Sequence, residues 1–587
     1  MAISSGLLPS FGAVLSASVP LNCSISAIQS VLPVGADVDF VQTVAVNSTF
    51  EVPPENIAFP ISPVGLPSLC AVSAWVQAPG NTSFGFGLFL PGDWNGRFLA
   101  VGNAGFAGGI NWLEMGTQVR YGFATMSTDT GHSSNSTDGR WAYKQPEVIN
   151  NWGYRALHGS VVTAKQITEA FYAQKPTYSY YSGCSTGGRQ GFKEAQMFPD
   201  DFDGIVAGAP SWYTKHLQTW VIRYWLNNVP NTDAHHIPPE LFPVIGAEAL
   251  RQCDPQDGLT DSIISDPYNC NFRPEALLCG VETVASNSTA ATCLTSSQID
   301  TVKKIYSDWV EWDQRLIYPH VAPGSEASWG VWLLNSSVAP STYGTDYVKY
   351  FLGLGPDWSP WSLNDSIVKF AEKDDPGNAS VDTDLSAFQK KGGKLISFHG
   401  FADSLVPSAG TTYFYDQVDK NLKPQGIKTS DFFRVFMVPG MGHCGGTTPS
   451  FNASWYFAGG FQASLIGPTV HSVPGFSDAK HDILLALTNW VENGTAPDSV
   501  IATKWTNDTE HTTVLRQRPI CRYPEQAKYT GSGDPNQADS WECRLPWEEG
   551  SGPLQNPGSV GSSVFHCSHI LRILLVVIIS SYSMMIL

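Results

Sequence analysis

The sequence predicts an α/β fold with a mostly parallel sheet, and two observations support this prediction. Helical patterns such as residues 152–171 and 189–197 lie between short apolar runs, and alternation of strands with helices is typical of a parallel sheet covered by helices. The apolar runs are bounded by glycine or polar residues, as buried strands are, and they cover residues 84–90, 97–101, 123–127, 178–182, 204–207, 394–398 and 434–438.

The segment 212–382 differs from the rest of the chain. It is rich in Trp, Pro and Asn, contains four cysteines and lacks the alternation of strands and helices. Because core strands resume at residue 394, we expect a lid-like domain, residues 212–382, inserted into an α/β core domain formed by residues 21–211 and 383–548. Residues 549–587 would then be a linker and an apolar tail.

The bulk composition is that of a large globular protein. The chain has 587 residues, of which 42% are hydrophobic and 15% charged, so it can bury a sizeable core. The formal net charge of −18 argues against nucleic acid or an anionic membrane surface as a partner.

Cysteines and glycosylation sequons indicate an oxidising compartment. Several of the 11 cysteines fall into local pairs, and an odd number leaves one thiol unpaired. No CxxC or HxxxH spacing is present, which argues against zinc. We therefore expect a secreted glycoprotein. The local pairs are Cys253 with Cys270, Cys279 with Cys293, and Cys521 with Cys543. The sequons are at Asn22, Asn47, Asn81, Asn135, Asn287, Asn335, Asn364, Asn378, Asn452, Asn493 and Asn507.

Both ends of the chain carry apolar segments. Residues 7–17 form an apolar run that ends in small residues, so residues 1–20 are a candidate signal peptide, although Pro9 interrupts the run. The tail 573–587 is strongly apolar and follows small residues at 558–559. Three explanations of this tail stay open: a GPI-attachment signal, a short membrane anchor, and an erroneous extension of the reading frame.

The stretch 178–189 contains a G-x-S-x-G motif. Gly183, Ser185 and Gly187 come directly after an apolar strand and directly before a helical pattern. In an α/β-hydrolase this turn lifts the serine hydroxyl above the sheet edge, and the flanking glycines relieve crowding. We therefore predict an α/β-hydrolase core with a large inserted lid domain, and Ser185 as its nucleophile.

An acid and a base follow in the order that this fold requires, which is Ser, Asp, His. Asp403 lies in a loop after the strand 394–398, where an orienting carboxylate belongs. His443 lies in a Gly-rich loop after the strand 434–438. Either residue taken alone could be an ordinary turn residue.

Two cysteines stand next to the two catalytic candidates. Cys184 immediately precedes Ser185, and Cys444 immediately follows His443. If these cysteines are bonded, their Cβ atoms lie about 3.8 Å apart, and the nucleophile and the base are held in neighbouring positions. A structural disulfide could fall anywhere, so its place beside both candidates supports a catalytic triad of Ser185, Asp403 and His443.

Together these segments resemble the fungal tannase and feruloyl esterase family. The resemblance rests on the GCSTGG segment around Ser185, the HGxxDxxVP segment ending at Pro407 and the GHCGG segment around His443. It extends from about residue 23 to residue 543 and implies a carboxylic ester hydrolase. In that family Ser185 would be the nucleophile, His443 the base and Asp403 its orienter.

The resemblance also implies a further disulfide near the N-terminus. Cys23 and Cys70 are the candidates for it, which leaves Cys567 unpaired.

Two backbone N–H groups are candidates for the oxyanion hole. The residue after the nucleophile, Thr186, is the expected first donor. The loop 102–106 follows a predicted strand, and its Asn103 is the candidate second donor, with a plain Gly-rich turn as an equal alternative.

An acidic loop in the inserted domain suits a metal ion. Asp254, Asp257 and Asp261 lie within eight residues around a glycine turn, and hard oxygen ligands on a tight loop suit Ca²⁺. A solvated acidic turn is the alternative. The family resemblance implies a structural Ca²⁺ held by these three carboxylates and by the backbone oxygens of Leu259 and Ile263.

Several functions are compatible with these motifs. The first is a feruloyl esterase that cleaves phenolic acid esters, including esters linked to plant cell-wall polysaccharide, through an acyl-enzyme on Ser185. A tannase, a peptidase and a non-catalytic glycan-binding surface protein are the alternatives. The complete triad argues against a non-catalytic protein, and the resemblance argues against a peptidase. The dibasic Lys-Arg site that fungal tannases often carry is missing here, which favours feruloyl esters.

Aromatic residues of the inserted domain are candidates for stacking on a phenolic ring. We expect more than half of them to form the domain's own core instead. The candidates are Trp220, Tyr224, Trp225, Trp329 and Trp332.

Overall fold

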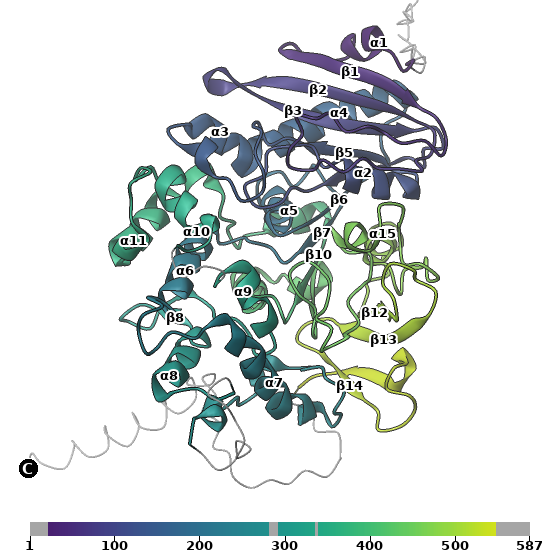
Figure 1. Ribbon diagram of the computed structural model, residues 1–587. Helices are drawn as coiled ribbons and strands as arrows, with labels where there is room; N and C mark the ends of the chain where they lie inside the picture. The colour runs from purple at the N-terminus through teal and green to yellow at the C-terminus, as the bar shows by residue number, and fades with distance from the viewer. Residues whose placement is uncertain (1–20, 281–291, 335–338, 547–587) are drawn as a thin grey trace, which may run out of the picture. The chain divides into compact units, whose positions relative to one another are not determined.

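A nine-stranded sheet lies at the centre of the computed structural model, in which residues 21–280, 292–334 and 339–546 are described (Figure 1). The strand order is β1-β2-β3-β5-β4-β6-β7-β10-β11. Strands β5, β4, β6, β7, β10 and β11 run parallel, and β1, β2, β3 and β5 pair antiparallel. The strands are β1 (Ala36–Val44), β2 (Leu69–Ala78), β3 (Thr82–Pro91), β4 (Arg97–Val101), β5 (Ala124–Thr128), β6 (Tyr178–Cys184), β7 (Gly204–Gly208), β10 (Lys394–Gly400) and β11 (Phe433–Val438).

Helices cover both faces of this sheet. The side chains of α4, α5 and α13 join the hydrophobic cluster on one face, and those of α2 and α15 join the cluster on the other. The described helices are α1 (Ile25–Gln29), α2 (Trp112–Gln118), α3 (Pro146–Asn150), α4 (Ala156–Tyr172), α5 (Thr186–Met197), α6 (Thr214–Leu226), α7 (Phe242–Cys253), α8 (Ser296–Ile305), α9 (Trp329–Trp332), α10 (Thr342–Asp346), α11 (Asp365–Asp374), α12 (Ser386–Lys391), α13 (Ala409–Leu422), α14 (Gln462–Ile466) and α15 (Ile483–Asn493).

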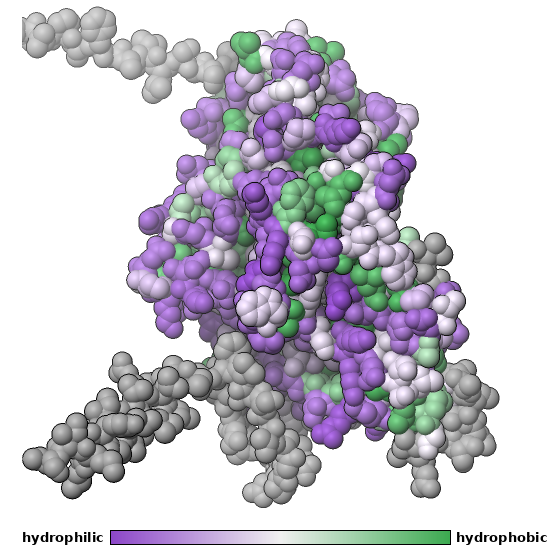
Figure 2. Space-filling model, turned by 90° about the vertical axis from the view of Figure 1, so that its left-hand side faces the viewer, coloured by the Kyte–Doolittle hydropathy of each residue, from purple (hydrophilic) through white to green (hydrophobic). Residues whose placement is uncertain are grey.

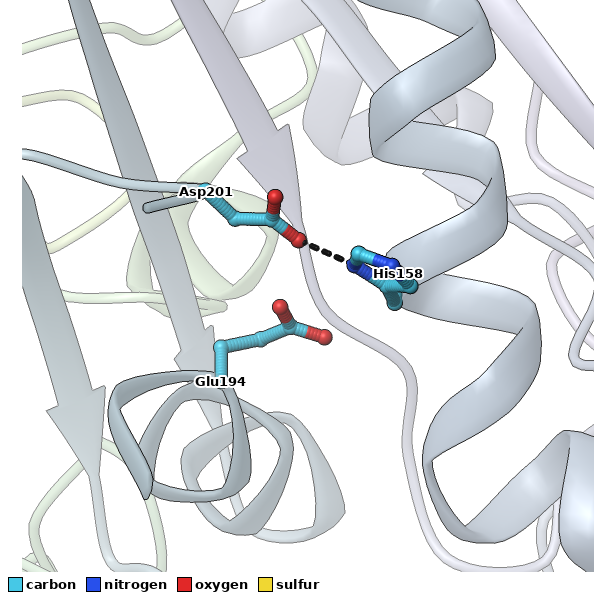
Figure 3. Close-up of side chains that lie close together, drawn as sticks. All are labelled: His158, Glu194 and Asp201. Atoms are coloured by element: carbon cyan, nitrogen blue, oxygen red, sulfur yellow. Dashed lines mark hydrogen bonds and ion pairs between the residues drawn. The ribbon is translucent and has the colours of Figure 1, made fainter. Parts of the chain in front are cut away.

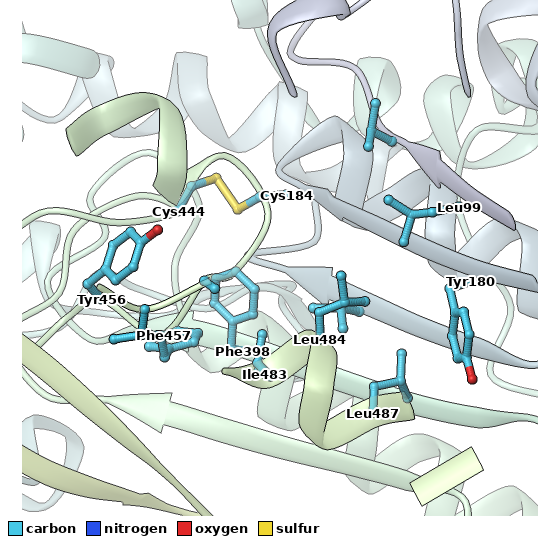
Figure 4. Close-up of a cluster of buried hydrophobic side chains, with 14 of the residues drawn as sticks. Leu99, Tyr180, Cys184, Phe398, Cys444, Tyr456, Phe457, Ile483, Leu484 and Leu487 are labelled. Carbon is cyan, nitrogen blue, oxygen red and sulfur yellow. A yellow bond between two sulfur atoms is a disulfide. The ribbon is translucent and has the colours of Figure 1, made fainter. Parts of the chain in front are cut away.

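The parallel strands are buried on both faces, and this explains their sequence. Successive side chains point to opposite faces, so Tyr180 belongs to one hydrophobic cluster and Tyr181 to the other. Figure 4 shows the first cluster, in which Leu484 and Leu487 of α15 lie near Tyr180. Leu487 is fully buried, which contributes about 1.5–3 kcal/mol. Strands buried on both faces are continuous apolar runs, as the sequence predicts.

The seven predicted strands are confirmed as β3, β4, β5, β6, β7, β10 and β11. The predicted helix 152–171 corresponds to α4, which a π-helical turn at Asn151–Arg155 precedes, and 189–197 lies inside α5. The sequence analysis missed β1 and β2, whose burial is mixed along the outer part of the sheet.

The inserted segment begins after β7 and ends before β10. These two strands are hydrogen-bonded neighbours in the sheet, so the chain leaves and re-enters at nearly the same place. The insertion, residues 212–382, holds α6 to α11 and a short hairpin of β8 (Trp309–Val310) and β9 (Leu316–Tyr318).

The insertion has its own hydrophobic core. Trp220, Tyr224 and Trp329 belong to that core, and Trp225 is also buried. Trp332 is half-buried at its edge. Four of the five aromatic candidates for ring stacking are therefore core residues.

Two hairpins follow α15. One consists of β12 (Ser499–Trp505) and β13 (Val514–Cys521), the other of β14 (Gln526–Tyr529) and β15 (Trp541–Arg544). Five disulfides are present among the described residues, and all five predicted pairs are confirmed: Cys23–Cys70, Cys184–Cys444, Cys253–Cys270, Cys279–Cys293 and Cys521–Cys543.

The face shown in Figure 2 is mostly hydrophilic, with apolar residues gathered in separate patches. Within the described ranges, no helix is both long and apolar enough to cross a membrane. The candidate signal peptide 1–20, the apolar tail and Cys567 lie outside the described residues.

Candidate active site

Ser185 occupies a sharp turn between β6 and α5. Its backbone has φ 64° and ψ −121°, a conformation that a residue with a side chain rarely adopts. Strain of this kind costs on the order of 1–3 kcal/mol and is typical of the nucleophile turn of α/β-hydrolases. A Cβ on Gly183 would lie 2.9 Å from the Gly187 backbone, so the two glycines of the motif permit close packing.

Asp403 and His443 come together at the same sheet edge. Asp403 follows β10, His443 follows β11, and His443 Nδ1 lies 2.7 Å from Asp403 Oδ2. Because the carboxylate accepts, Nδ1 carries the proton and Nε2 is left to act as a base. The other carboxylate oxygen, Oδ1, accepts from the backbone N–H groups of Leu405 at 2.9 Å and Val406 at 3.0 Å.

A second imidazole, His399, also binds Asp403. Its Nε2 lies 3.0 Å from Asp403 Oδ2 and 2.9 Å from the Val406 carbonyl oxygen, and its Nδ1 lies 2.7 Å from Thr411 Oγ1. The carbonyl can only accept, so Nε2 carries the hydrogen and Nδ1 accepts from Thr411. The sequence analysis assigned His399 no role. Its place in the HGxxDxxVP segment, four residues before Asp403, is the signal that could have identified it.

These contacts determine the charge of Asp403. Burial favours the neutral form of this fully buried carboxyl group. The positive charge that His443 and His399 carry when protonated, together with their hydrogen bonds, outweighs that effect and holds the pKa of Asp403 well below its usual value. Asp403 is therefore an ionised carboxylate that orients His443 and can stabilise an imidazolium.

The disulfide Cys184–Cys444 connects Ser185 with His443. The Cα atoms of the two cysteines are 5.8 Å apart although 260 positions separate them in the sequence. Figure 4 shows this bond at the upper side of the hydrophobic cluster, to which both cysteines belong. In the described part of the chain, no hydrogen bond joins the Ser185 hydroxyl to His443, so the disulfide is the link between them.

The two oxyanion candidates differ in this structure. Thr186 is the first residue of α5, where a backbone N–H has no partner within the helix. The Asn103 N–H instead donates to Gln190 Oε1 at 3.0 Å, and Gln190 Nε2 donates back to Asn103 Oδ1 at 3.0 Å. The prediction that Asn103 is the second donor is therefore not supported. Asn103 attaches its loop to α5.

The inserted domain contacts both loops that carry the acid and the base. The Trp332 ring lies 6.2 Å from the His443 ring, edge to face. Ser328 and Ser404 share a hydrogen bond of 2.8 Å between their hydroxyl oxygens. Trp332 is thus the one of the five aromatic candidates whose ring contacts the His443 ring.

The carboxylates of the acidic loop in the inserted domain accept hydrogen bonds from backbone groups of the same loop. Asp254 accepts from the backbone N–H groups of Asp261 and Ser262, and Asp257 accepts from that of Leu259. Asp261 forms an ion pair with Arg518. The donor set is chemically suited to Ca²⁺, since all its side chains offer hard oxygen atoms. Within the described ranges, these carboxylates are not gathered into one cluster.

A separate cluster joins α4 to the far end of α5. His158 Nδ1 lies 2.6 Å from Asp201 Oδ2, and the Glu194 carboxyl group faces this pair (Figure 3). Ligand atoms of these three residues lie within 4.8 Å of one another. Burial and the neighbouring Asp201 raise the pKa of Glu194 well above its usual value. The neutral carboxyl form of Glu194 is therefore favoured beside the Asp201 carboxyl group.

The family model for tannase and feruloyl esterase matches residues 70–328 and 362–544. Among curated relatives, the probable feruloyl esterase B-2 of Aspergillus fumigatus is 35% identical over 514 residues, which are 86% of this chain and 92% of that protein. The probable feruloyl esterase B-1 of Aspergillus flavus is 34% identical over 480 residues, 81% of this chain and 86% of that protein.

Solved structures give a consistent result. Feruloyl esterase B from Aspergillus oryzae superposes with a TM-score of 0.77 at 33% identity and covers 88% of this chain and 100% of its own. Tannin acyl hydrolase from Aspergillus niger has a TM-score of 0.66 at 20% identity, covering 89% of this chain and 96% of its own, and shows the fold alone.

Proposed function

The chain belongs to the tannase and feruloyl esterase family and is a carboxylic ester hydrolase, and from this premise we propose that it cleaves feruloyl esters through an acyl-enzyme on Ser185. The observation that carries the proposal is the arrangement of Asp403 and His443 at 2.7 Å, linked to the Ser185 turn by the Cys184–Cys444 disulfide.

Each group has one task in the proposed mechanism. His443 Nε2 takes the proton from Ser185 Oγ as that oxygen attacks the ester carbonyl carbon, and the N–H of Thr186 stabilises the oxygen that becomes negative. The tetrahedral intermediate collapses, the alcohol leaves with the proton from His443, and the acyl group stays on Ser185. A water molecule, activated by His443, then releases the free acid and restores the serine.

Ionised Asp403 supports both proton transfers. It keeps the Nδ1–H tautomer of His443 in place and stabilises the imidazolium form that each half-reaction produces. The His399 and backbone donors hold the carboxylate in one orientation, so little reorganisation is needed.

The relatives favour a feruloyl over a galloyl acyl group. Relatives named feruloyl esterase B are 33–35% identical to this chain, whereas the tannin acyl hydrolase structure is 20% identical. Galloyl esters remain the second candidate, because the family model covers both activities.

Two measurements test this function. Ser185→Ala should abolish hydrolysis of methyl ferulate while the melting temperature stays unchanged; near-normal turnover of the folded variant would refute the triad. The ratio of kcat/KM for methyl ferulate to that for methyl gallate should exceed one. A gallate preference above tenfold would reverse the order of the two candidates.

We also propose that the loop of Asp254, Asp257 and Asp261 binds a structural Ca²⁺, with the backbone oxygens of Leu259 and Ile263. The chemistry of the donor set supports this, since three carboxylates on one short loop offer the hard oxygen ligands that Ca²⁺ prefers. Binding to the folded state alone stabilises by about 2.7 kcal/mol at 100 times Kd. Excess chelator should lower the melting temperature. An unchanged temperature, with no calcium found by elemental analysis, would reject the site.

An extracellular, glycosylated state is proposed from two further observations. Five disulfides are typical of secreted proteins. The sequon asparagines in the described ranges are all exposed, as glycan attachment requires: Asn22, Asn47, Asn81, Asn135, Asn364, Asn378, Asn452, Asn493 and Asn507. Glycosidase treatment of secreted protein should lower its mass, and an unchanged mass would contradict the proposal.

A further inference from the structure

A pocket opens at the carboxyl edge of the sheet, on which Ser185 also lies. It has a volume of about 240 Å³, with walls from β1, β2, β3 and the segments 53–56, 108–112 and 129–133. Asp129 follows β5, and Ser185 follows β6, the second strand along. Neighbouring strands are about 4.8 Å apart, so the two strand ends are separated by about 10 Å.

Hydrogen-bond acceptors line this pocket. Asp129 Oδ1 accepts from the N–H groups of Gly85 at 2.8 Å and Gly131 at 2.7 Å, whereas Oδ2 takes no donor within the described part of the chain. The exposed carboxylates of Asp39 and Glu55 also line the pocket. The pocket therefore offers several acceptors to one ligand.

A further acceptor that lines the pocket, on Asn56, is buried and has no hydrogen-bond partner among the described residues. Asn56 is 9% exposed, and its Nδ2 donates to the carbonyl oxygens of Ile110 at 2.7 Å and Phe59 at 3.4 Å. Those two carbonyls fix the orientation of the amide, so the remaining atom is the oxygen. This Oδ1 makes no hydrogen bond among the described residues. A buried unpaired acceptor is costly, and a donor from a ligand would satisfy it.

An aromatic surface adjoins the acceptors. The Trp75 side chain on β2 is 40% exposed and lines the pocket, whose floor includes the buried Trp112. Three glycines of the wall allow the polar residues to pack close: a Cβ on Gly85 would lie 2.8 Å from Asp129 Oδ2, and one on Gly109 would lie closer still to Asn56 Oδ1. An indole ring packs well against the C–H face of a sugar ring while the sugar hydroxyl groups bind the surrounding acceptors.

The charge of the pocket excludes an anionic ligand. None of the described residues that line it is Lys or Arg. Burial lowers the pKa of His132 to about 4, and both ring nitrogens already have partners, Phe106 O and Thr130 Oγ1. A free phenolic acid or a phosphate would therefore meet the exposed carboxylates of Asp39 and Glu55 and no Lys or Arg among the described lining residues. The acceptors and the lack of Lys and Arg among the described lining residues favour an occupant that is not an anion and is rich in hydroxyl donors.

We propose that this pocket binds one ring of a neutral oligosaccharide, with Trp75 against the sugar face and Asp39, Asn56 and Asp129 accepting its hydroxyl hydrogens. The kinetic part of this inference rests on the proposed function, since the sugar would be the alcohol half of the ester whose acyl group reacts at Ser185. The binding part does not depend on it.

The pocket also adjoins the loop near the nucleophile. Asn103 Nδ2 donates to the Gly109 carbonyl oxygen at 3.0 Å, and Gly109 is part of the pocket wall. Thr186 Oγ1 in turn donates to the Gly105 carbonyl oxygen at 3.0 Å. A sugar in the pocket and an ester at Ser185 thus contact two ends of one loop.

Binding is tested with the inactive Ser185→Ala protein and xylotriose as the probe, by calorimetry. Xylotriose should bind, and Trp75→Ala should weaken binding about tenfold, which corresponds to about 1.4 kcal/mol. Glu55→Ala, in an exposed loop, is a second variant with little risk to folding and should weaken binding in the same direction. Trp312→Ala is the matched control, because Trp312 is 86% exposed and does not line the pocket; it should change nothing.

Kinetics then link the pocket to catalysis. Trp75→Ala in the active enzyme should lower kcat/KM about tenfold for a feruloylated oligosaccharide and leave methyl ferulate unchanged within a factor of about two. Absence of xylotriose binding, equal binding by the Trp75→Ala and control proteins, or tighter binding of galacturonate than of xylotriose would overturn the inference. Failure to cleave methyl ferulate would refute the proposed function and leave the binding result to decide the pocket.

Discussion

Helix α5 has a buried histidine–carboxylate cluster near each end, and the two clusters hold protons differently. Near its start, Asp403 is fully buried with its pKa held far below the usual value. Near its end, Glu194 is 1% exposed with its pKa raised well above the usual value. Both carboxyl groups are removed from water to the same degree, so burial alone does not determine their charge.

The difference lies in the donors that each carboxyl group receives. Asp403 accepts from two imidazoles and two backbone N–H groups. Glu194 Oε2 has no hydrogen bond among the described residues, and the nearby Asp201 repels a negative charge. A buried carboxylate stays ionised only where donors replace water, and the cluster next to the nucleophile is built in this way.

The largest expected effect is the difference in kcat between two variants that each carry one substitution, one in each cluster. Asp403→Asn should lower kcat about 10⁴-fold, because the amide favours the wrong tautomer of His443. Glu194→Gln should change kcat by less than about twofold, since a neutral amide resembles a protonated carboxyl group. Steady-state kinetics on methyl ferulate measures both. Equal losses in the two variants would show that the clusters do not differ in role.

Removing the Cys184–Cys444 disulfide tests how far catalysis depends on the covalent link between the two loops. Replacing both Cys184 and Cys444 by Ala should lower kcat/KM about a hundredfold, because a misplacement of about 1 Å between base and nucleophile has that effect. Peptide mapping of the active enzyme provides the control. Free thiols at these two positions in fully active protein would contradict the restraint.

The second imidazole can be tested by a graded pair of variants. His399→Leu removes the donor to Asp403 and should lower kcat about tenfold with KM little changed, since it acts by positioning. His399→Asn keeps an N–H donor and should recover most of the activity. Equal loss in both variants, accompanied by equal loss of thermal stability, would reduce His399 to a packing role.

The smallest expected effect is on stability and concerns Glu194. A raised folded-state pKa means that the folded protein holds a proton which the unfolded chain releases above its pKa of about 4.3. Stability should therefore fall as the pH rises from about 4.3 towards the folded pKa, by about 1.4 kcal/mol for each unit of pKa increase. Glu194→Gln removes this loss. Its melting temperature relative to wild type should rise with pH, and a constant difference would contradict the assignment.

The sequence predicted the parallel core and the triad for one physical reason. Ser185, Asp403 and His443 each follow a buried strand, and parallel strands end at one edge, so pattern alone places them together. The adjoining cysteines added a distance constraint that composition could not provide.

Contacts between side chains from distant segments were not predictable in this way. The N–H of Asn103 is taken by Gln190, which lies 87 positions later. Glu194 and His158 meet only because α5 packs beside α4. The acceptors of the proposed oligosaccharide pocket come from β1, from the segment after β5 and from an irregular loop, and β1 has no clear strand signal. Such clusters follow from packing and not from local sequence.

The place of the inserted domain also affects the order in which the chain folds. Strands β7 and β10 pair directly, and the chain between Cys184 and Cys444 spans 260 positions. Closing a loop of that length costs on the order of 5 kcal/mol in chain entropy, and the pairing of β10 with β7 closes most of the same loop, so this pairing is expected to be a late event. Once Cys184 and Cys444 are joined, the unfolded chain no longer has that freedom to lose. Inserting a whole domain between two paired strands increases the chain entropy that is lost on folding. The disulfide beside Ser185 offsets this loss, because it restricts the unfolded chain in advance.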